Sequence, residues 1–243
     1  MRELFVEKSD DLKLFGATVN QTFEAYVFAS VLRWYRENGW KVALKPPLDP
    51  VARGKAGGSV RLKFNTRGRP AGYSYGKCTK AGASILVRHQ IRVSTSSDDG
   101  KLPSANICCD VAILQELDLT EFASDTAVPN DLLVTFGEAK HMSAFAELLA
   151  SFIGVVHELV PQALEGVSRS PDHPPPFLYV SGYLYPTAKG IKRTIETRGL
   201  AVGVFDCMSP LLQSDPVPTR KPPSKALATR GKLRRARPRA RVR

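Results

Sequence analysis

Alternation between hydrophobic and polar positions divides the chain into segments that follow two different periods. Residues 20–38, NQTFEAYVFASVLRWYREN, carry apolar side chains at the three- and four-residue spacing of an amphipathic helix, and Gly39 supplies its stop. The same spacing recurs over 143–160, where Ser143 is a suitable N-cap, and over 188–199, which ends at glycine. We therefore predict three helices.

Shorter apolar runs bounded by turn residues predict the strands. The expected strands are 59–64, 84–93, 106–114, 131–141, 176–186 and 200–207. The stretches 45–58 and 65–83 are rich in glycine, proline and basic residues, so we expect loops there. Helices and strands in this order predict an α/β protein, in which a mixed central β-sheet is flanked by helices.

The bulk properties of the 243-residue chain indicate one folded domain with a tail. From about Met208 onward, proline, lysine and arginine dominate, and such a segment buries too little apolar surface to offset its chain entropy. We therefore predict a domain over 1–207 and a disordered basic tail over 208–243. No apolar run approaches the roughly 18 to 20 residues of a spanning helix, and the N-terminus lacks the apolar segment of a secretory signal. We expect a cytoplasmic protein with reduced cysteines and no membrane partner.

The net charge of +12 is unevenly distributed along the chain. Eleven of the 35 basic residues lie in 220–243, which contains no acid, and the rest of the chain has 24 basic against 23 acidic residues. A second basic stretch, 41–80, contains ten lysines and arginines and the single acid Asp49. Positive charge segregated in this way is typical of proteins that bind a polyanion, so nucleic acid is the expected partner.

Basic side chains in these two stretches are candidates for contact with the phosphate backbone, which glycines in 41–80 would allow to approach closely. The candidates are Arg53, Lys55, Arg61, Lys63, Arg67, Arg69, Lys77, Arg234 and Arg235. Two alternatives stay open, because charge runs are often ordinary solvated surface. The stretch 41–80 could be such a surface, and the tail could be a solubilising or targeting extension.

Three charged residues stand in strands that are otherwise apolar. Asp110 is the only charged residue in NICCDVAIL, and Glu138 and Lys140 end the next strand on one face, because side chains two residues apart point the same way. A buried charge is costly unless it is paired or binds a metal. If the strands are neighbours, Asp110 and Glu138 can bind one Mg²⁺ together with the backbone carbonyl of Ala139. Lys140 would then assist an attacking water or neutralise a transition state, which is the chemistry of phosphodiester hydrolysis.

The spacing of these residues resembles a known signature. Asp110, followed 28 positions later by Glu138-Ala139-Lys140, is similar to the D…ExK motif of the PD-(D/E)xK superfamily of restriction-endonuclease-like nucleases. The resemblance covers roughly residues 18–207. It implies a restriction-endonuclease-like core (αβββαβ) with a further helix and strand, and a site built from Asp110, Glu138 and Lys140. Cys109 replaces the proline of the motif, at a position that varies in the superfamily.

The resemblance also implies a function. It is that of a Mg²⁺-dependent endonuclease acting on DNA in bacterial restriction or defence, with Mn²⁺ as a substitute metal. A homodimer is expected, because cutting both strands of a duplex needs two sites. Some members add an acid from the first helix, for which Glu24 is the candidate; its alternative is an ordinary surface glutamate. The sequence does not specify the form of the nucleic acid, nor an activating partner or small nucleotide.

Other interpretations of the motif stay open. Asp110 could form a structural ion pair with Arg88 or Arg92, and Glu138 and Lys140 could form a solvated strand end with a weak ion pair. On this interpretation the protein would be a non-catalytic nucleic-acid-binding protein with a degenerate nuclease fold.

Overall fold

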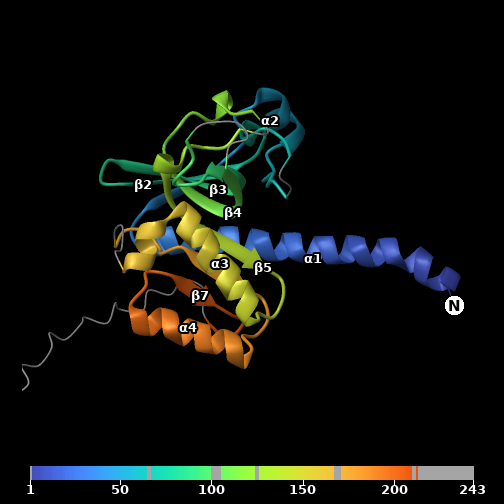
Figure 1. Ribbon diagram of the computed structural model, residues 1–243. Coiled ribbons are helices and arrows are strands. Elements are labelled where there is room, and N and C mark those ends of the chain that lie inside the picture. Colours follow the sequence, from blue (N-terminus) through green and yellow to red (C-terminus); the bar gives the residue numbers. More distant parts are fainter. Residues whose placement is uncertain are drawn as a thin grey trace, which may run out of the picture. The chain divides into compact units, whose positions relative to one another are not determined.

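The computed structural model describes residues 2–64, 67–99, 105–123, 126–166, 171–209 and 212, with side chains from residue 16 onward. It shows an α/β protein built on a seven-stranded mixed sheet in the order β1-β2-β3-β4-β5-β6-β7 (Figure 1). The strands are β1 (Lys41–Lys45), β2 (Tyr75–Lys80), β3 (Ala83–Ser94), β4 (Asn106–Gln115), β5 (Leu133–Lys140), β6 (Phe177–Val180) and β7 (Gly203–Phe205). The α-helices are α1 (Arg2–Glu37), α2 (Pro50–Ala56), α3 (Ala146–Leu159) and α4 (Pro186–Arg198). The class predicted from the sequence is thereby confirmed at the level of a mixed sheet flanked by helices.

The type of strand pairing changes once across the sheet. Neighbouring strands from β1 to β5 are antiparallel, whereas β5, β6 and β7 are parallel to one another. Antiparallel neighbours can be joined by short turns, but parallel neighbours need a crossover connection, which is usually a helix. Helices α3 and α4 are these crossovers, since α3 precedes β6 and α4 precedes β7.

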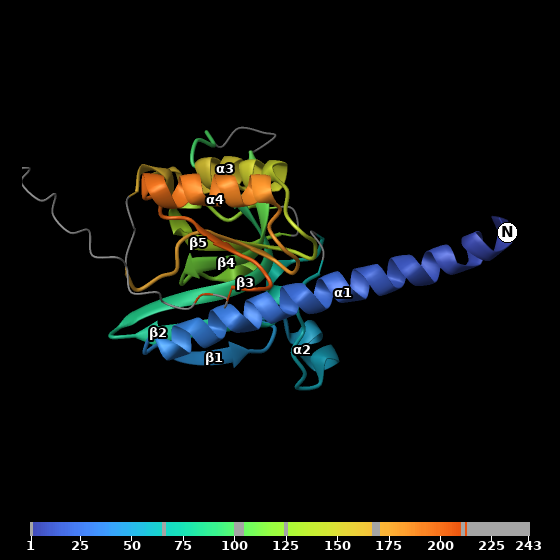
Figure 2. The same ribbon diagram turned by 90° about the horizontal axis from the view of Figure 1, so that it is seen from below.

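Each face of the sheet has its own hydrophobic cluster. Helix α1 covers one face and buries Val31 and Tyr35 against it, while α3 and α4 cover the other with Phe152 and Ile195. Figure 2 shows α1 on one side of the strands and α3 and α4 on the opposite side. The protein is thus a three-layer arrangement with α1 opposite the two crossover helices.

Strand β3 reverses its facing pattern halfway along. Ile85 and Val87 pack in the cluster with α1, but Ile91 and Val93 pack in the cluster with α3 and α4. Regular alternation would place all four side chains on one face. The reversal occurs at Gln90, whose φ of 51° lies in the left-handed region. One residue therefore divides the apolar stripe of β3 between the two layers.

Strand β4 reverses at the same level. Val111 packs toward α1, whereas Cys109 packs in the opposite cluster. The pairing register does not slip, because His89 pairs with Val111 and Ile91 pairs with Cys109. Asp110 therefore lies opposite Gln90 at the point where both strands turn over.

Two strands were missed, and one predicted strand is wrong. Residues 59–64 lie outside any strand, and Val60 is 54% exposed, so its apolar side chain does not join a core. Strands β1 and β2 lie in the basic stretch 41–80 and are flanked or interrupted by glycine, proline and lysine, which are depleted in strands. Gly76 in β2 has a packing reason: a Cβ there would lie 2.3 Å from Cδ2 of Leu32 in α1.

Several predicted boundaries were also wrong. Helix α1 begins at Arg2 rather than at residue 20, and α3 begins at Ala146 with Phe145, not Ser143, at the N-cap. The Ser143 hydroxyl instead accepts a hydrogen bond from the backbone N–H of Tyr183 at 3.2 Å. The predicted end of α4 is confirmed, since Gly199 adopts a left-handed conformation with φ 67°.

Some expectations concern regions that the structure describes only in part. The predicted disordered tail over 208–243 lies outside the described residues, apart from 208–209 and 212. In the described ranges, no helix is long and apolar enough to cross a membrane. All four cysteines are described, and each is a free thiol.

Candidate active site

The candidate site lies where β4 and β5 part. Their ladder pairs Val111 with Gly137, and the next two residues along, Asp110 and Glu138, are not paired by the backbone. Instead, the Asp110 carboxylate accepts a hydrogen bond from the backbone N–H of Ala139 at 3.0 Å. A side chain thus takes the place of a backbone hydrogen bond between the strands. Asp110 and Glu138 are only 7% and 9% exposed.

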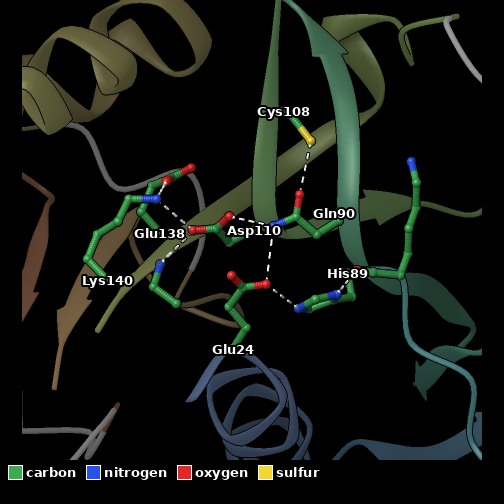
Figure 3. Close-up of polar contacts among 9 residues, drawn as sticks. Glu24, His89, Gln90, Cys108, Asp110, Glu138 and Lys140 are labelled. Atoms are coloured by element: carbon green, nitrogen blue, oxygen red, sulfur yellow. Dashed lines mark hydrogen bonds and ion pairs between the residues drawn. The ribbon is translucent and has the colours of Figure 1, made fainter. Parts of the chain in front are cut away.

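Lys140 joins the two acids. Its Nζ lies 2.9 Å from Oδ2 of Asp110 and 2.7 Å from Oε2 of Glu138. Figure 3 shows Lys140 beside the two acids. The three residues that the sequence predicted as a site therefore lie together. They come from two neighbouring antiparallel strands, so the spacing of 28 residues in the sequence becomes direct contact in the fold.

The alternative ion pairs of Asp110 are wrong. Arg88 is buried and donates to the backbone carbonyls of Pro70 and Tyr73, while Arg92 donates to the side chain of Asn106. The cation that contacts Asp110 is Lys140.

The pKa of Glu138 depends on its burial and on the charges beside it. Burial, together with the neighbouring carboxylate of Asp110, raises the pKa of Glu138 to about 7, even though Lys140 opposes this shift. Burial alone would lower the pKa of Lys140, but attraction to Glu138 and Asp110 raises it above its ordinary value. Lys140 therefore stays an ammonium group. One cation balances two acids, so the cluster keeps an excess of negative charge whenever Glu138 is ionised.

Glu24 on α1 reaches this cluster through Gln90. The Nε2 of Gln90 donates to Oδ1 of Asp110 at 2.8 Å and to Oε2 of Glu24 at 3.2 Å (Figure 3). Its Oε1 accepts a weak hydrogen bond from the thiol of Cys108 at 3.4 Å. Sequence reasoning missed Gln90. The available signal was an uncharged polar residue inside the apolar strand predicted next to that of Asp110.

His89 contributes a second contact to Glu24. The His89 ring is 2% exposed, and its Nδ1 contacts the carbonyl oxygen of Lys63. A carbonyl oxygen can only accept, so Nδ1 carries the proton and donates. The other ring nitrogen, Nε2, lies 3.3 Å from Oε2 of Glu24. The helix acid thus lies between His89 and Gln90, both from β3, and it accepts its hydrogen bond from Gln90, since among the described residues His89 Nε2 has no hydrogen-bond partner.

The oxygen donors at this site suit a hard divalent cation. Asp110 and Glu138 are buried carboxylates with excess negative charge, and Mg²⁺ favours a few carboxylates while retaining several waters. Glu24 contacts Asp110 only through Gln90. Accordingly, in the described parts of the chain, no group of three or more histidine, cysteine, aspartate and glutamate side chains is placed to hold a metal ion. A cation here would bind two carboxylates and a backbone carbonyl, with Ala139 as the candidate.

The predicted nucleic-acid contacts fall into four groups. Five of these side chains are exposed: Arg53, Lys55, Arg61, Arg67 and Arg69. Lys77 is half-buried in β2 and forms an ion pair with Glu116. Lys63 is only 3% exposed, and burial lowers its pKa. The prediction that Lys63 contacts phosphate on an exposed basic surface is therefore wrong. Arg234 and Arg235 lie outside the described residues.

Fold and site together define an α/β protein in which two buried acids and a lysine lie in contact where the pairing of the central strands β4 and β5 ends. Comparison of the chain with protein-family models and with curated proteins finds no match. Its function therefore has to be inferred from the geometry of the cluster.

Proposed function

We propose that the protein is a Mg²⁺-dependent endonuclease that hydrolyses phosphodiester bonds in DNA. The observation that carries this proposal is the contact of Lys140, at the end of β5, with both Glu138 on the same strand and Asp110 on the adjacent strand β4. An ordinary surface ion pair is exposed and worth little, whereas these two acids are buried, and burial together with Asp110 raises the pKa of Glu138. Perturbed pKa values of this kind are concentrated at functional sites.

Each residue has a role in the proposed reaction. Asp110, Glu138 and the Ala139 carbonyl would hold Mg²⁺, for which Mn²⁺ should substitute. When bound, the metal would polarise the scissile phosphate and favour ionisation of water. Lys140 is a poor base because its pKa is raised. We therefore assign its ammonium group to the negative charge that develops on the phosphate oxygens as water attacks phosphorus and the bridging oxygen leaves.

The order of elements supports a restriction-endonuclease-like core. Helix α1 is followed, after β1, α2 and β2, by the antiparallel run β3-β4-β5, then by α3 and the parallel strand β6. In this proposal β1, α2 and β2 are additions before the core, and α4 and β7 extend it. The site residues lie on β4 and β5, the second and third strands of that run, with Glu24 on the first helix.

The substrate contacts belong to the same proposal. The exposed Arg53, Lys55, Arg61, Arg67 and Arg69 would contact phosphates, together with Arg234 and Arg235 of the tail. A homodimer would place two sites on a duplex, and restriction or defence in the bacterial cytoplasm is the context we propose.

Cleavage of supercoiled plasmid and of labelled single strands tests the proposal, with Mg²⁺, Mn²⁺ or EDTA. We expect metal-dependent cutting that Asp110→Ala and Lys140→Ala each reduce by at least about 100-fold, as removal of one transition-state contact does elsewhere. Lys189→Ala is the matched control, because Lys189 is an exposed lysine on α4. Cutting that persists in Asp110→Ala would contradict the assignment.

A second function, nucleic-acid binding without hydrolysis, is favoured by one observation. Both carboxylate oxygens of Asp110 already accept hydrogen bonds within the protein, from Gln90, Ala139 and Lys140. If the cluster is structural, the wild type will cut nothing and bind no metal, and EDTA will leave its affinity for DNA unchanged.

A further inference from the structure

Gln90 has a backbone conformation that its side-chain type does not favour. Among the described non-glycine residues, only Ala81, Gln90 and Leu212 have positive φ, and of these Gln90 alone lies within a strand. Glycine and asparagine adopt the left-handed region with less strain than glutamine does. Outliers of this kind persist when surrounding structure enforces them, and they cluster at functional sites.

The side chain of Gln90 explains what the strained backbone achieves. Reversal of β3 at this residue turns the amide toward α1 on one side and β4 on the other, so that Nε2 reaches both Glu24 and Asp110. An amide group has two N–H donors and no charge. It therefore holds two carboxylates near each other without neutralising their charge. A lysine or arginine at this position would neutralise it.

We propose that Gln90 is a positioning residue, which is anchored to Glu24 and orients Asp110 toward a divalent cation bound together with Glu138, and thereby sets the affinity of the site for metal. This inference rests on the proposed function, because it requires the acid cluster to bind metal. Groups that hydrogen-bond to metal ligands typically change metal affinity 10- to 100-fold when they are removed. Gln90 contacts two acids from different elements, Asp110 on β4 and Glu24 on α1.

Gln90→Gly separates the side chain from the backbone. Glycine accepts positive φ, so the variant should keep or raise the Tm in EDTA, but it lacks the amide that holds the acids. Isothermal titration of the full-length protein with Mn²⁺ should give a Kd that is 10- to 100-fold weaker than that of the wild type. A merely structural role predicts the reverse pattern, a lower Tm with an unchanged Kd.

Ala81→Gly is the matched control. Ala81 has a φ of 49° in the turn between β2 and β3, so glycine relieves a comparable strain without touching the acids. It should raise the Tm and leave the Mn²⁺ affinity as in the wild type. Gln90→Asn is the second variant, to be used if Gln90→Gly does not fold. Asparagine tolerates positive φ but is one methylene shorter, so it should also weaken Mn²⁺ binding.

The outcomes separate this inference from the proposed function. A wild type that binds Mn²⁺ and a Gln90→Gly variant that binds it 10- to 100-fold more weakly support the role of Gln90. Equal Mn²⁺ affinity in the two proteins overturns that role while leaving the nuclease proposal intact. A wild type that neither binds Mn²⁺ nor cuts DNA overturns both.

Discussion

At the scale of single residues, the ionised carboxylate of Glu138 destabilises the folded state. The pKa of Glu138 is raised from 4.5 to about 7 by burial and by Asp110. The folded state therefore binds this proton more tightly than the unfolded chain does. By linkage, the contribution of Glu138 to stability is greatest at low pH and declines as the pH rises from 4.5 to 7. A bound cation would reverse this penalty, so stability and metal binding are connected through one side chain.

Glu138→Gln should stabilise the metal-free protein above pH 7. Glutamine can still accept the hydrogen bond from Lys140 but has no charge to bury, so we expect a Tm several degrees higher at pH 8. The advantage should shrink toward pH 5, where Glu138 is already protonated. Thermal unfolding in EDTA across this range measures it, with the exposed Glu147→Gln on α3 as a control. A lower Tm for Glu138→Gln at pH 8 would contradict the charge state assigned to the cluster.

The cysteines should differ in their reactivity. Burial raises the pKa of Cys78 to about 12 and also raises the pKa of Cys108 and of Cys109, whereas Cys207 is exposed. Because the thiolate is the reactive form, we expect one fast-reacting thiol per folded chain with a disulfide reagent at pH 8, and none in Cys207→Ser. Four thiols should react in guanidinium. Two or more fast thiols in the native protein would show that the buried sites open readily.

At the scale of elements, glycines distinguish close packing from open helix surface. A Cβ at Gly137 in β5 would lie 2.1 Å from Cζ of Phe177, whose ring is fully buried against it. A Cβ at Gly190 in α4 would meet nothing within 4 Å. The same substitution should therefore have opposite effects in the two elements.

Gly190→Ala should raise the Tm by about 2–4 °C, since alanine is favoured over glycine by roughly 1 kcal/mol within a helix. Gly137→Ala should lower the Tm, because the buried ring of Phe177 has to move. Differential scanning calorimetry of both variants tests the packing. A neutral Gly137→Ala would mean that β5 and β6 are less tightly packed than the structure shows.

Elements with a clear apolar period could be predicted from the sequence, and so could the residues that they carry. Asp110, Glu138 and Lys140 interrupt apolar strands, so their types and positions indicated a shared site before any contact was known. Gln90 gave only a weak signal, as an uncharged polar residue within a predicted strand, because its role depends on a backbone angle and on the strand opposite it. Strand β2 was missed because Gly76 serves a close approach of α1, and this contact leaves no periodic signal.

At the scale of the whole molecule, charge outside the site should govern encounter with nucleic acid. Deleting residues 220–243 removes eleven lysines and arginines and no acid, so the formal net charge falls from +12 to +1. Each phosphate contact adds about 0.9 to the slope of log affinity against log salt for duplex DNA. We expect the truncated protein to show a slope smaller by several units in fluorescence anisotropy titrations. An unchanged slope would remove the tail from the DNA-binding surface.

The reversal at Gln90 also constrains how this chain can change. Ile85, Val87, Ile91 and Val93 alternate along the sequence as one stripe, interrupted by His89, yet they supply two separate cores. Were the strand to become regular, the layer under α3 and α4 would lose two of its side chains, and α1 would be crowded by them. Substitutions that make β3 a regular strand at residue 90 would therefore disturb the packing of both cores. The backbone conformation of Gln90 that shapes the candidate site is therefore also maintained by the packing of the two cores.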